Sequence, residues 1–254
     1  MSQYNSPPAA SSPPRRVAVD GRPIRPIQPT VTYVLLGLTI FTFLIQYITE
    51  WTYGADLAAM FGMKINTAIE GGQIWRLITP VLLHGSLLHL GFNMYALYIF
   101  GPNLESMYGH GRFLALYLLS GFAGNVLSFL LSPGNSLGAS TAIFGLLAAE
   151  GVFLYQNSGM IRSAQRMLTN LIAIAVINLV IGFAPGMNID NLGHLGGLLG
   201  GAMFAWFGGP LLAVRTGYEQ PVLVDQRTPR QVLMAGVGVF TVFALLALME
   251  IFIT

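Results

Sequence analysis

Seven long apolar blocks are the feature that most limits what this chain can fold into. Each holds about 18 to 22 residues, enough for a helix to cross a hydrocarbon layer of roughly 30 Å. The blocks lie near residues 31–48, 82–100, 113–131, 137–155, 167–184, 191–207 and 232–253. Only 9% of the residues are charged, whereas a soluble domain carries about 25%. We therefore predict an all-α polytopic membrane protein with seven spans.

The segments between the blocks divide the chain into four parts. Residues 1–29 hold seven of the 14 prolines and four arginines, a composition typical of a disordered tail. Residues 30–210 are predicted to form a six-helix core, in which 49–81 is a long first loop that is too polar to be a span. We interpret 211–231 as a linker and 232–254 as one additional transmembrane helix.

The distribution of Lys and Arg predicts the orientation of the spans. If the tail is cytoplasmic and the spans alternate, ten of the 12 basic residues fall on the cytoplasmic side, as the positive-inside rule requires. The two others are Lys64 and Arg76. The chain is thus predicted to lie in a bacterial-type cell membrane with its N-terminus in the cytoplasm. A net charge of +2 gives no reason to expect nucleic acid, and the absence of Cys excludes disulfides and thiolate nucleophiles.

Three spans begin with polar residues that are unusual at membrane depth. His84, His89 and Asn93 lie at the start of the second block, Ser140 at the start of the fourth and His194 at the start of the sixth. Buried polar groups in a membrane are costly unless they pair or face a water-filled cavity. Because these three spans all begin at the outer face, we expect the five side chains to lie at a similar depth near the outer leaflet.

Ser140 and His194 each have a structural and a chemical interpretation. Ser140 could be an ordinary N-cap, or a nucleophile beside free backbone N–H groups that stabilise an oxyanion. His194 could serve helix packing, or it could be the base that a serine nucleophile needs. Gly197 and Gly201 share the His194 face, and such small residues let membrane helices approach closely. Together these positions favour a Ser–His pair.

His89 and Asn93 are four residues apart and therefore share one helix face. Both can donate hydrogen bonds, as groups that stabilise an oxyanion must. A metal site is the rival interpretation, but His84 and His89 are five apart and no acid lies near them in the sequence. We therefore predict no metal and no cofactor.

Four short motifs occur in one order along the chain, and with them it resembles the rhomboid family of intramembrane serine proteases. The motifs are Trp75-Arg76, His84-x4-His89-x3-Asn93, Gly138-x-Ser140 and His194-x2-Gly197-x3-Gly201. The resemblance covers about 31–207, the six-helix rhomboid core. The block at 232–253 resembles the extra C-terminal helix of some members.

The resemblance implies a serine endopeptidase with a dyad of Ser140 and His194 and no third acid. It implies an oxyanion hole formed by the Ser140 backbone N–H with the side chains of His89 and Asn93, and it implies that Phe144 stacks on His194. The expected substrates are single-span or polytopic membrane proteins, cleaved near the outer leaflet. They would enter past the fifth span and the loop at 182–191.

Other roles are also implied by the resemblance. Trp75 and Arg76 belong to the family motif of the first loop, and Glu105 matches an acid that anchors this loop, through Arg76 in our interpretation. His84 is expected to have a structural or hydrogen-bonding role. Two positions depart from the family pattern: Thr141 replaces the Gly that usually follows the serine, and Gly193 replaces an Ala that often precedes the histidine.

Two alternatives stay open. One is a catalytically weak or inactive rhomboid-like protein that binds membrane helices, against which the intact Ser140 and His194 argue. The other is a transporter or channel, a class that often shows internal repeats or intramembrane charges along a path. The spans hold almost no charges, with Glu150 as the exception.

Overall fold

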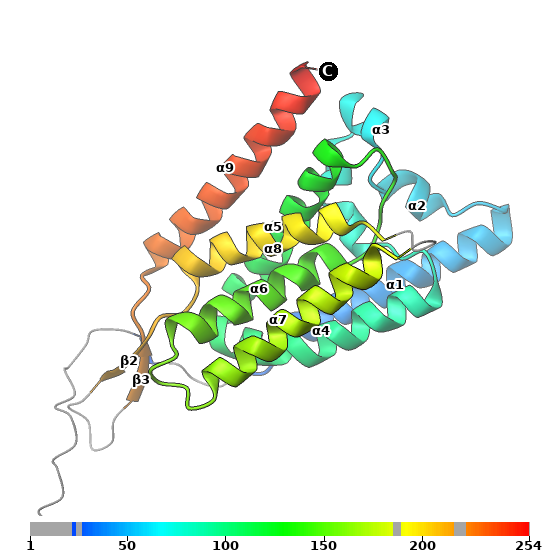
Figure 1. The fold of residues 1–254 in the computed structure, drawn as a ribbon. Helices are drawn as coiled ribbons and strands as arrows, with labels where there is room; N and C mark the ends of the chain where they lie inside the picture. Colours follow the sequence, from blue (N-terminus) through cyan, green and yellow to red (C-terminus); the bar gives the residue numbers. More distant parts are fainter. Residues whose placement is uncertain (1–21, 24–26, 185–188, 216–221, 254) are drawn as a thin grey trace, which may run out of the picture.

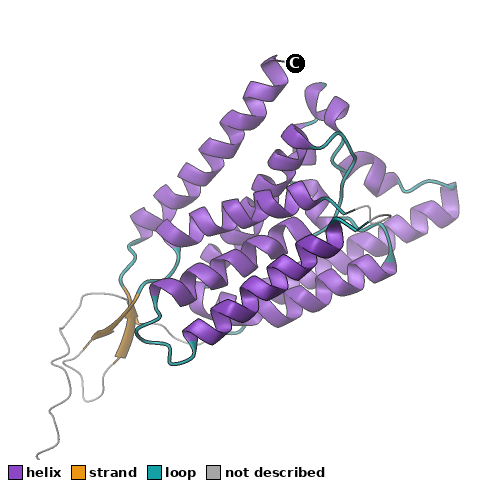
Figure 2. Ribbon diagram, viewed as in Figure 1, coloured by secondary structure: helices purple, strands orange, loops and turns teal. Residues whose placement is uncertain are grey.

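The computed structural model describes residues 22–23, 27–184, 189–215 and 222–253. Within these ranges, seven long helices form a bundle (Figures 1 and 2), and each contains most of one predicted apolar block. They are α1 (Thr30–Tyr53), α4 (Leu87–Tyr108), α5 (His110–Leu131), α6 (Ser140–Gln156), α7 (Ala164–Gly182), α8 (Asn191–Gly208) and α9 (Pro229–Ile253).

Four of these helices, α1, α5, α7 and α9, are long and apolar enough to cross a membrane by length and composition. Helices α4, α6 and α8 do not reach the length and hydropathy expected of a membrane span. These three helices carry the polar candidate residues Asn93, Ser140 and His194. The most extensive packing is among α5, α6 and α8, so these three helices form the centre of the bundle. The chain is therefore a mostly helical, polytopic membrane protein.

The predicted long loop is an ordered layer at one end of the bundle. It contains α2 (Leu57–Gly62), α3 (Asn66–Glu70) and two 3₁₀ turns, η1 (Ile74–Leu77) and η2 (Thr79–Leu82). This layer lies at the opposite end of the bundle from the strands β2 and β3 (Figure 1). We call it the outer loop.

Helix α4 begins at Leu87, five residues later than the start of the predicted block. Ser86 is extended, and its hydroxyl accepts a hydrogen bond from the His89 N–H at 3.1 Å, which is an N-cap. His84 therefore lies in the connection before α4 and not on the helix, which corrects the prediction that it opens the second span.

A small antiparallel sheet departs from the all-α prediction. It contains β1 (Arg22–Pro23), β2 (Leu212–Arg215) and β3 (Val222–Asp225), in the order β1-β3-β2. The segment predicted as a plain linker thus holds two strands, whose branched apolar residues suit a pleated surface. Asp225 joins the sheet to the bundle, because its carboxylate accepts from Arg112 Nη2 at 2.5 Å. The predicted disorder of the tail concerns residues that lie mostly outside the described ranges.

Candidate active site

Helices α6 and α8 bring Ser140 and His194 into contact. Ser140 is the first residue of α6 and His194 lies in the first turn of α8. The distance from His194 Nε2 to Ser140 Oγ is 2.8 Å, a hydrogen bond of the length expected between a base and a nucleophile.

Glycines permit this approach. A Cβ on Gly197 would overlap the Thr141 carbonyl, and a Cβ on Gly201 would overlap the backbone of Gly145. Helices α6 and α8 therefore touch backbone to backbone one and two turns after His194, as small residues in membrane helices allow.

The His194 imidazole is buried, with 6% of its surface exposed. It stacks on Phe144, with ring centroids 4.2 Å apart and planes at 12°. Its Nδ1 has no hydrogen-bond partner among the residues that the structure describes. The stacking on Phe144 and the hydrogen bond to Ser140 Oγ therefore orient the ring.

The turn before Ser140 depends on a glycine with positive φ. Gly138 has φ +138°, and a Cβ there would lie 2.8 Å from His89 Cε1. Gly138 therefore lets the chain pass directly beside the His89 ring. The next residue, Ala139, donates its N–H to His84 Nε2 at 3.4 Å. The rings of His84 and His89 meet edge to face at 5.0 Å.

The three groups predicted to stabilise a negatively charged oxygen can each donate a hydrogen bond. The backbone N–H of Ser140 belongs to the first turn of α6, where N–H groups lack an intrahelical acceptor. His89 lies against Gly138. Asn93 is buried, and its Nδ2 donates to the His89 carbonyl at 2.9 Å, a bond that uses one of the two N–H groups of the amide.

The two departures from the family pattern are neighbours in space. A Cβ on Gly193 would lie 3.1 Å from Thr141 Cγ2, and a Cβ on Gly124 would lie 2.6 Å from Thr141 Cβ. Thr141 fits beside Ser140 because α5 and α8 both present a glycine to it. An alanine at 193 would press on the threonine methyl.

The predicted pairing of Arg76 with Glu105 is wrong. Arg76 donates to the carbonyls of Met60 and Met63, each at 2.7 Å. Among the described residues, no ion pair joins Arg76 to Glu105. Glu105 lies about 27 Å along α4 from Leu87 by helix rise, whereas Arg76 lies in the outer loop.

Glu105 instead holds the beginning of α1. Its carboxylate accepts from the N–H groups of Val31 and Thr32 at 2.8 and 2.7 Å, and from Thr32 Oγ1 at 2.7 Å. It also contacts His110 Nδ1 at 2.5 Å. The carboxylate therefore satisfies N–H groups in the first turn of α1, where a helix has unpaired donors and favours negative charge.

Trp75 and Arg76 both stabilise the outer loop from within. The Trp75 indole donates to the Phe61 carbonyl at 3.0 Å and stacks on the Phe61 ring at 5.4 Å. With the bonds of Arg76 to the carbonyls of Met60 and Met63, the pair closes the loop on itself. Among the described residues, neither Trp75 nor Arg76 forms a hydrogen bond with Ser140 or His194.

The sequence analysis did not identify two charged residues, Asp190 at the start of α8 and Lys64 in the outer loop. Asp190 caps α8 by accepting from the Gly193 N–H at 2.9 Å, and it also bonds to the Ser128 hydroxyl. Lys64 is fully buried in the outer loop and donates to the carbonyls of Ser132 and Gly134. Burial lowers the pKa of Lys64 to about 8, and the nearby charge of Asp190 opposes this shift. Asp190 directly precedes the apolar block at 191–207, and an Asp in that position is a sequence signal for a helix N-cap.

Fold and site together define a polytopic membrane protein with a buried Ser–His pair. The Rhomboid domain family matches residues 71–211, which include every motif from Trp75 to Gly201. The chain belongs to the rhomboid family.

Three curated relatives show how far the similarity extends. Rhomboid protease GluP of Bacillus subtilis is 44% identical over 174 residues, which are 68% of this chain and 34% of that protein. Putative rhomboid protease YdcA of Bacillus subtilis is 38% identical over 56% of this chain and 70% of its own length. Rhomboid-like protease 1 of Toxoplasma gondii is 38% identical over 58% of this chain and 51% of its own. The chain thus spans about a third of GluP and about half of the Toxoplasma protein.

Proposed function

We propose that this chain is an intramembrane serine endopeptidase that cuts transmembrane substrates near the outer leaflet. The observation that carries the proposal is the 2.8 Å contact between Ser140 Oγ and His194 Nε2 at the centre of a membrane bundle. Family membership and relatives named as rhomboid proteases support it.

The reaction would proceed by acyl transfer. His194 Nε2 accepts the proton of Ser140 Oγ as the oxygen attacks the substrate carbonyl, and the protonated imidazole then donates to the leaving amine. A water, deprotonated by the same imidazole, hydrolyses the acyl-enzyme. Stacking on Phe144 keeps the ring in place through both steps, since a base must stay within about 3 Å of the proton it transfers.

The negative charge that develops on the carbonyl oxygen would be held by the Ser140 N–H, His89 and Asn93. Donors that are in place before the reaction stabilise the transition state without a reorganisation cost. The outer loop and His84 would fix these donors, because they bind the backbone of the residues just before Ser140.

We propose a topology of seven membrane crossings with the outer loop on the non-cytoplasmic side. This topology places ten of the 12 basic residues in the cytoplasm, as the positive-inside rule favours. A substrate helix would have to unwind locally, because its peptide bonds are shielded by helical hydrogen bonds. We propose that it enters past α7, since only 11% of the apolar window of this helix is buried. Residues 185–188 of the loop that follows α7 lie outside the described ranges.

The test is labelling by a fluorophosphonate together with cleavage of tagged transmembrane substrates. Ser140→Ala and His194→Ala should each abolish labelling and cleavage, since removing a member of such a unit costs on the order of 10⁶ in turnover. Ser158→Ala, at an exposed position in the α6–α7 connection, is the matched control and should behave as wild type.

Two results would count against the proposal. If the purified Ser140→Ala variant still cleaves substrate, Ser140 and His194 are not the catalytic dyad. A folded wild-type chain that resists the probe and cuts no substrate, yet retains membrane helices, would instead support the inactive rhomboid-like binder.

A further inference from the structure

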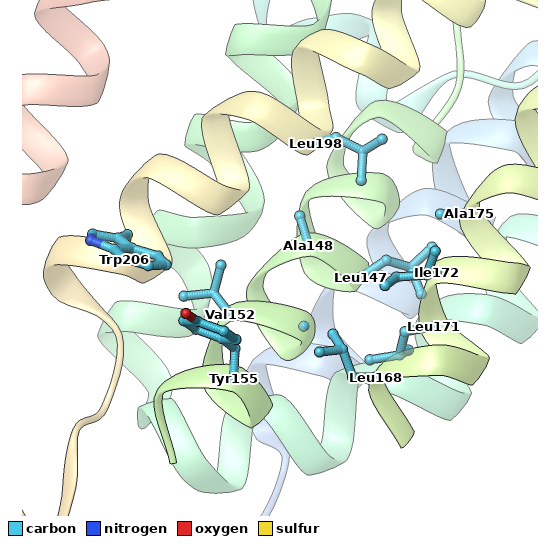
Figure 3. A pocket seen from close by; sticks show the side chains of 11 residues that line it. Leu147, Ala148, Val152, Tyr155, Leu168, Leu171, Ile172, Ala175, Leu198 and Trp206 are labelled. Carbon is cyan, nitrogen blue, oxygen red and sulfur yellow. The ribbon is translucent and has the colours of Figure 1, made fainter. Parts of the chain in front are cut away.

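An apolar groove lies on the membrane-facing side of the bundle, away from the Ser140–His194 pair. Its walls are Leu147–Tyr155 of α6, Leu168–Ala175 of α7 and Leu198–Trp206 of α8, and its volume is about 380 Å³. Figure 3 shows Tyr155 and Trp206 together at one end of the groove, while Leu198 and Ala175 lie toward the other. We call it the α6–α8 groove.

The dimensions of the groove fit a single extended hydrocarbon chain. From Leu198 to Trp206 it runs about 12 Å along α8 by helix rise, close to half of a hydrocarbon core of roughly 30 Å. Because a helix is about 10 Å across, most of a transmembrane helix would lie outside this groove, whereas a single acyl chain is narrow enough to lie within it.

The aromatic end of the groove lies where α6 ends and α7 begins, at the side of the bundle that carries the sheet. Tyr155 and Trp206 stack with ring centroids 5.9 Å apart. Tyr and Trp are enriched at membrane–water interfaces, because each has an apolar body and a polar tip. This end is thus placed at headgroup level, and the rest of the groove extends into the hydrocarbon.

Positive charge adjoins the aromatic end. Arg227 donates through Nη2 to the Trp206 carbonyl at 2.8 Å, and its buried Nε has no partner within the described part of the chain. Arg162 lies in the connection between α6 and α7 and is exposed. Three carboxylates lie on this side: Glu105 and Asp225 are paired with His110 and Arg112, and Glu150 is buried within α6. The end of the groove is therefore suited to an anionic headgroup.

We propose that the α6–α8 groove binds one anionic phospholipid from the leaflet on the arginine-rich side. One acyl chain fills the groove, the glycerol region lies at Tyr155 and Trp206, and the phosphate accepts from Arg227. The lipid stands behind α7, where it contacts the groove-facing side of that helix. Binding requires no catalytic residue, so it is independent of the proposed protease activity.

Trp206 can report on the lipid directly. The chain has three tryptophans, so Trp51→Phe with Trp75→Phe leaves Trp206 as the single emitter. This protein is placed in phosphatidylcholine vesicles that contain increasing fractions of phosphatidylglycerol or phosphatidylcholine brominated on the acyl chain. We expect brominated phosphatidylglycerol to quench Trp206 at a mole fraction at least fivefold lower than brominated phosphatidylcholine. Equal quenching by both lipids would mean only annular contact and would overturn the proposal.

Two variants separate the acyl and headgroup contacts. Gly151→Leu should fill the groove and abolish the preference, and a Cβ there meets only Leu168 Cδ1 at 3.5 Å, so the fold should tolerate it. Gly37→Leu, on an open face of α1, is its control. Arg227→Gln should reduce the preference about fivefold, the effect of one basic residue near a charged surface. Arg230→Gln removes the same charge from α9 and should have a smaller effect.

A second measurement uses the wild-type chain. Native mass spectrometry from mixed phosphatidylglycerol and phosphatidylcholine should retain one phosphatidylglycerol, which Gly151→Leu loses and Gly37→Leu keeps. If phosphatidylglycerol is retained equally by Gly151→Leu with a wild-type melting temperature, the lipid binds elsewhere and the groove assignment fails.

Discussion

Replacing Gly193 by Ala should destabilise this protein, because the added Cβ would press on both Asp190 and Thr141. The new Cβ would lie 3.1 Å from Thr141 Cγ2 and 2.7 Å from Asp190 Oδ2, both closer than ordinary contacts. Overpacking of this kind costs about 1–3 kcal/mol. Because His194 is the next residue, the displacement should also lengthen its hydrogen bond to Ser140 and lower turnover.

Thr141→Ser removes the methyl carbon that the new Cβ meets and keeps the hydroxyl. Alone, it should cost about 1 kcal/mol for a lost buried methyl. Combined with Gly193→Ala, it should relieve part of the strain, so that the double variant is more stable than the sum of the single changes by about 1 kcal/mol. The free energy of unfolding is measured by titration with SDS in mixed micelles, and turnover is measured on the same samples.

The outcome that would refute this reasoning is additivity. If the two single changes add to within about 0.5 kcal/mol, the residues do not act on each other, and Gly193 is needed only for Asp190 or for the backbone. Gly37→Ala, with nothing within 4 Å of its added Cβ, is the control for a Gly→Ala change in a helix.

Three further predictions address the site and the outer loop. Asn93→Ala should lower turnover, by as much as about a hundredfold for one lost oxyanion donor, with little change in KM; a raised KM with intact turnover would make it a substrate contact. Arg76→Ala removes the bonds to the Met60 and Met63 carbonyls and should lower the melting temperature more than it alters the chemistry; unchanged melting with no turnover would contradict this. Lys64 keeps its proton to a higher pH in the unfolded chain than in the fold, where its pKa is about 8. Stability should therefore rise between pH 8 and 10.5, by at most about 1.4 kcal/mol per pH unit, and Lys64→Met should remove this slope.

The long apolar blocks and the polar residues at their ends were readable from the sequence. Span length and hydropathy are local properties of the sequence. Ser140 and His194 were recognisable as candidates because polar side chains inside a membrane are energetically costly and therefore often functional. The predicted pairing of Arg76 with Glu105 is wrong because Glu105 lies about 27 Å along α4 from the start of that helix, whereas Arg76 lies in the outer loop.

Other features depend on contacts between distant segments and were not predictable. The sheet formed by β2 and β3 is held by Asp225 and Arg112, more than a hundred residues apart in the chain. The fit of Thr141 against Gly124 and Gly193 joins three helices, and each of the three residues alone carries no sign of the others. A local sequence pattern can indicate which residues are candidates for a site, but the packing of distant segments determines which of these residues are in contact.

The chain just before the nucleophile is fastened to the outer loop and its continuation at three successive places. Ser136 pairs with Lys64 through both backbone groups, the Gly138 N–H donates to the Pro80 carbonyl, and the Ala139 N–H donates to His84. These bonds tie the segment that precedes Ser140 to the outer loop, so a displacement of the loop would displace Ser140 as well. Among the described residues, no hydrogen bond joins α7 to the outer loop, so the entry past α7 that we propose would leave these three ties intact.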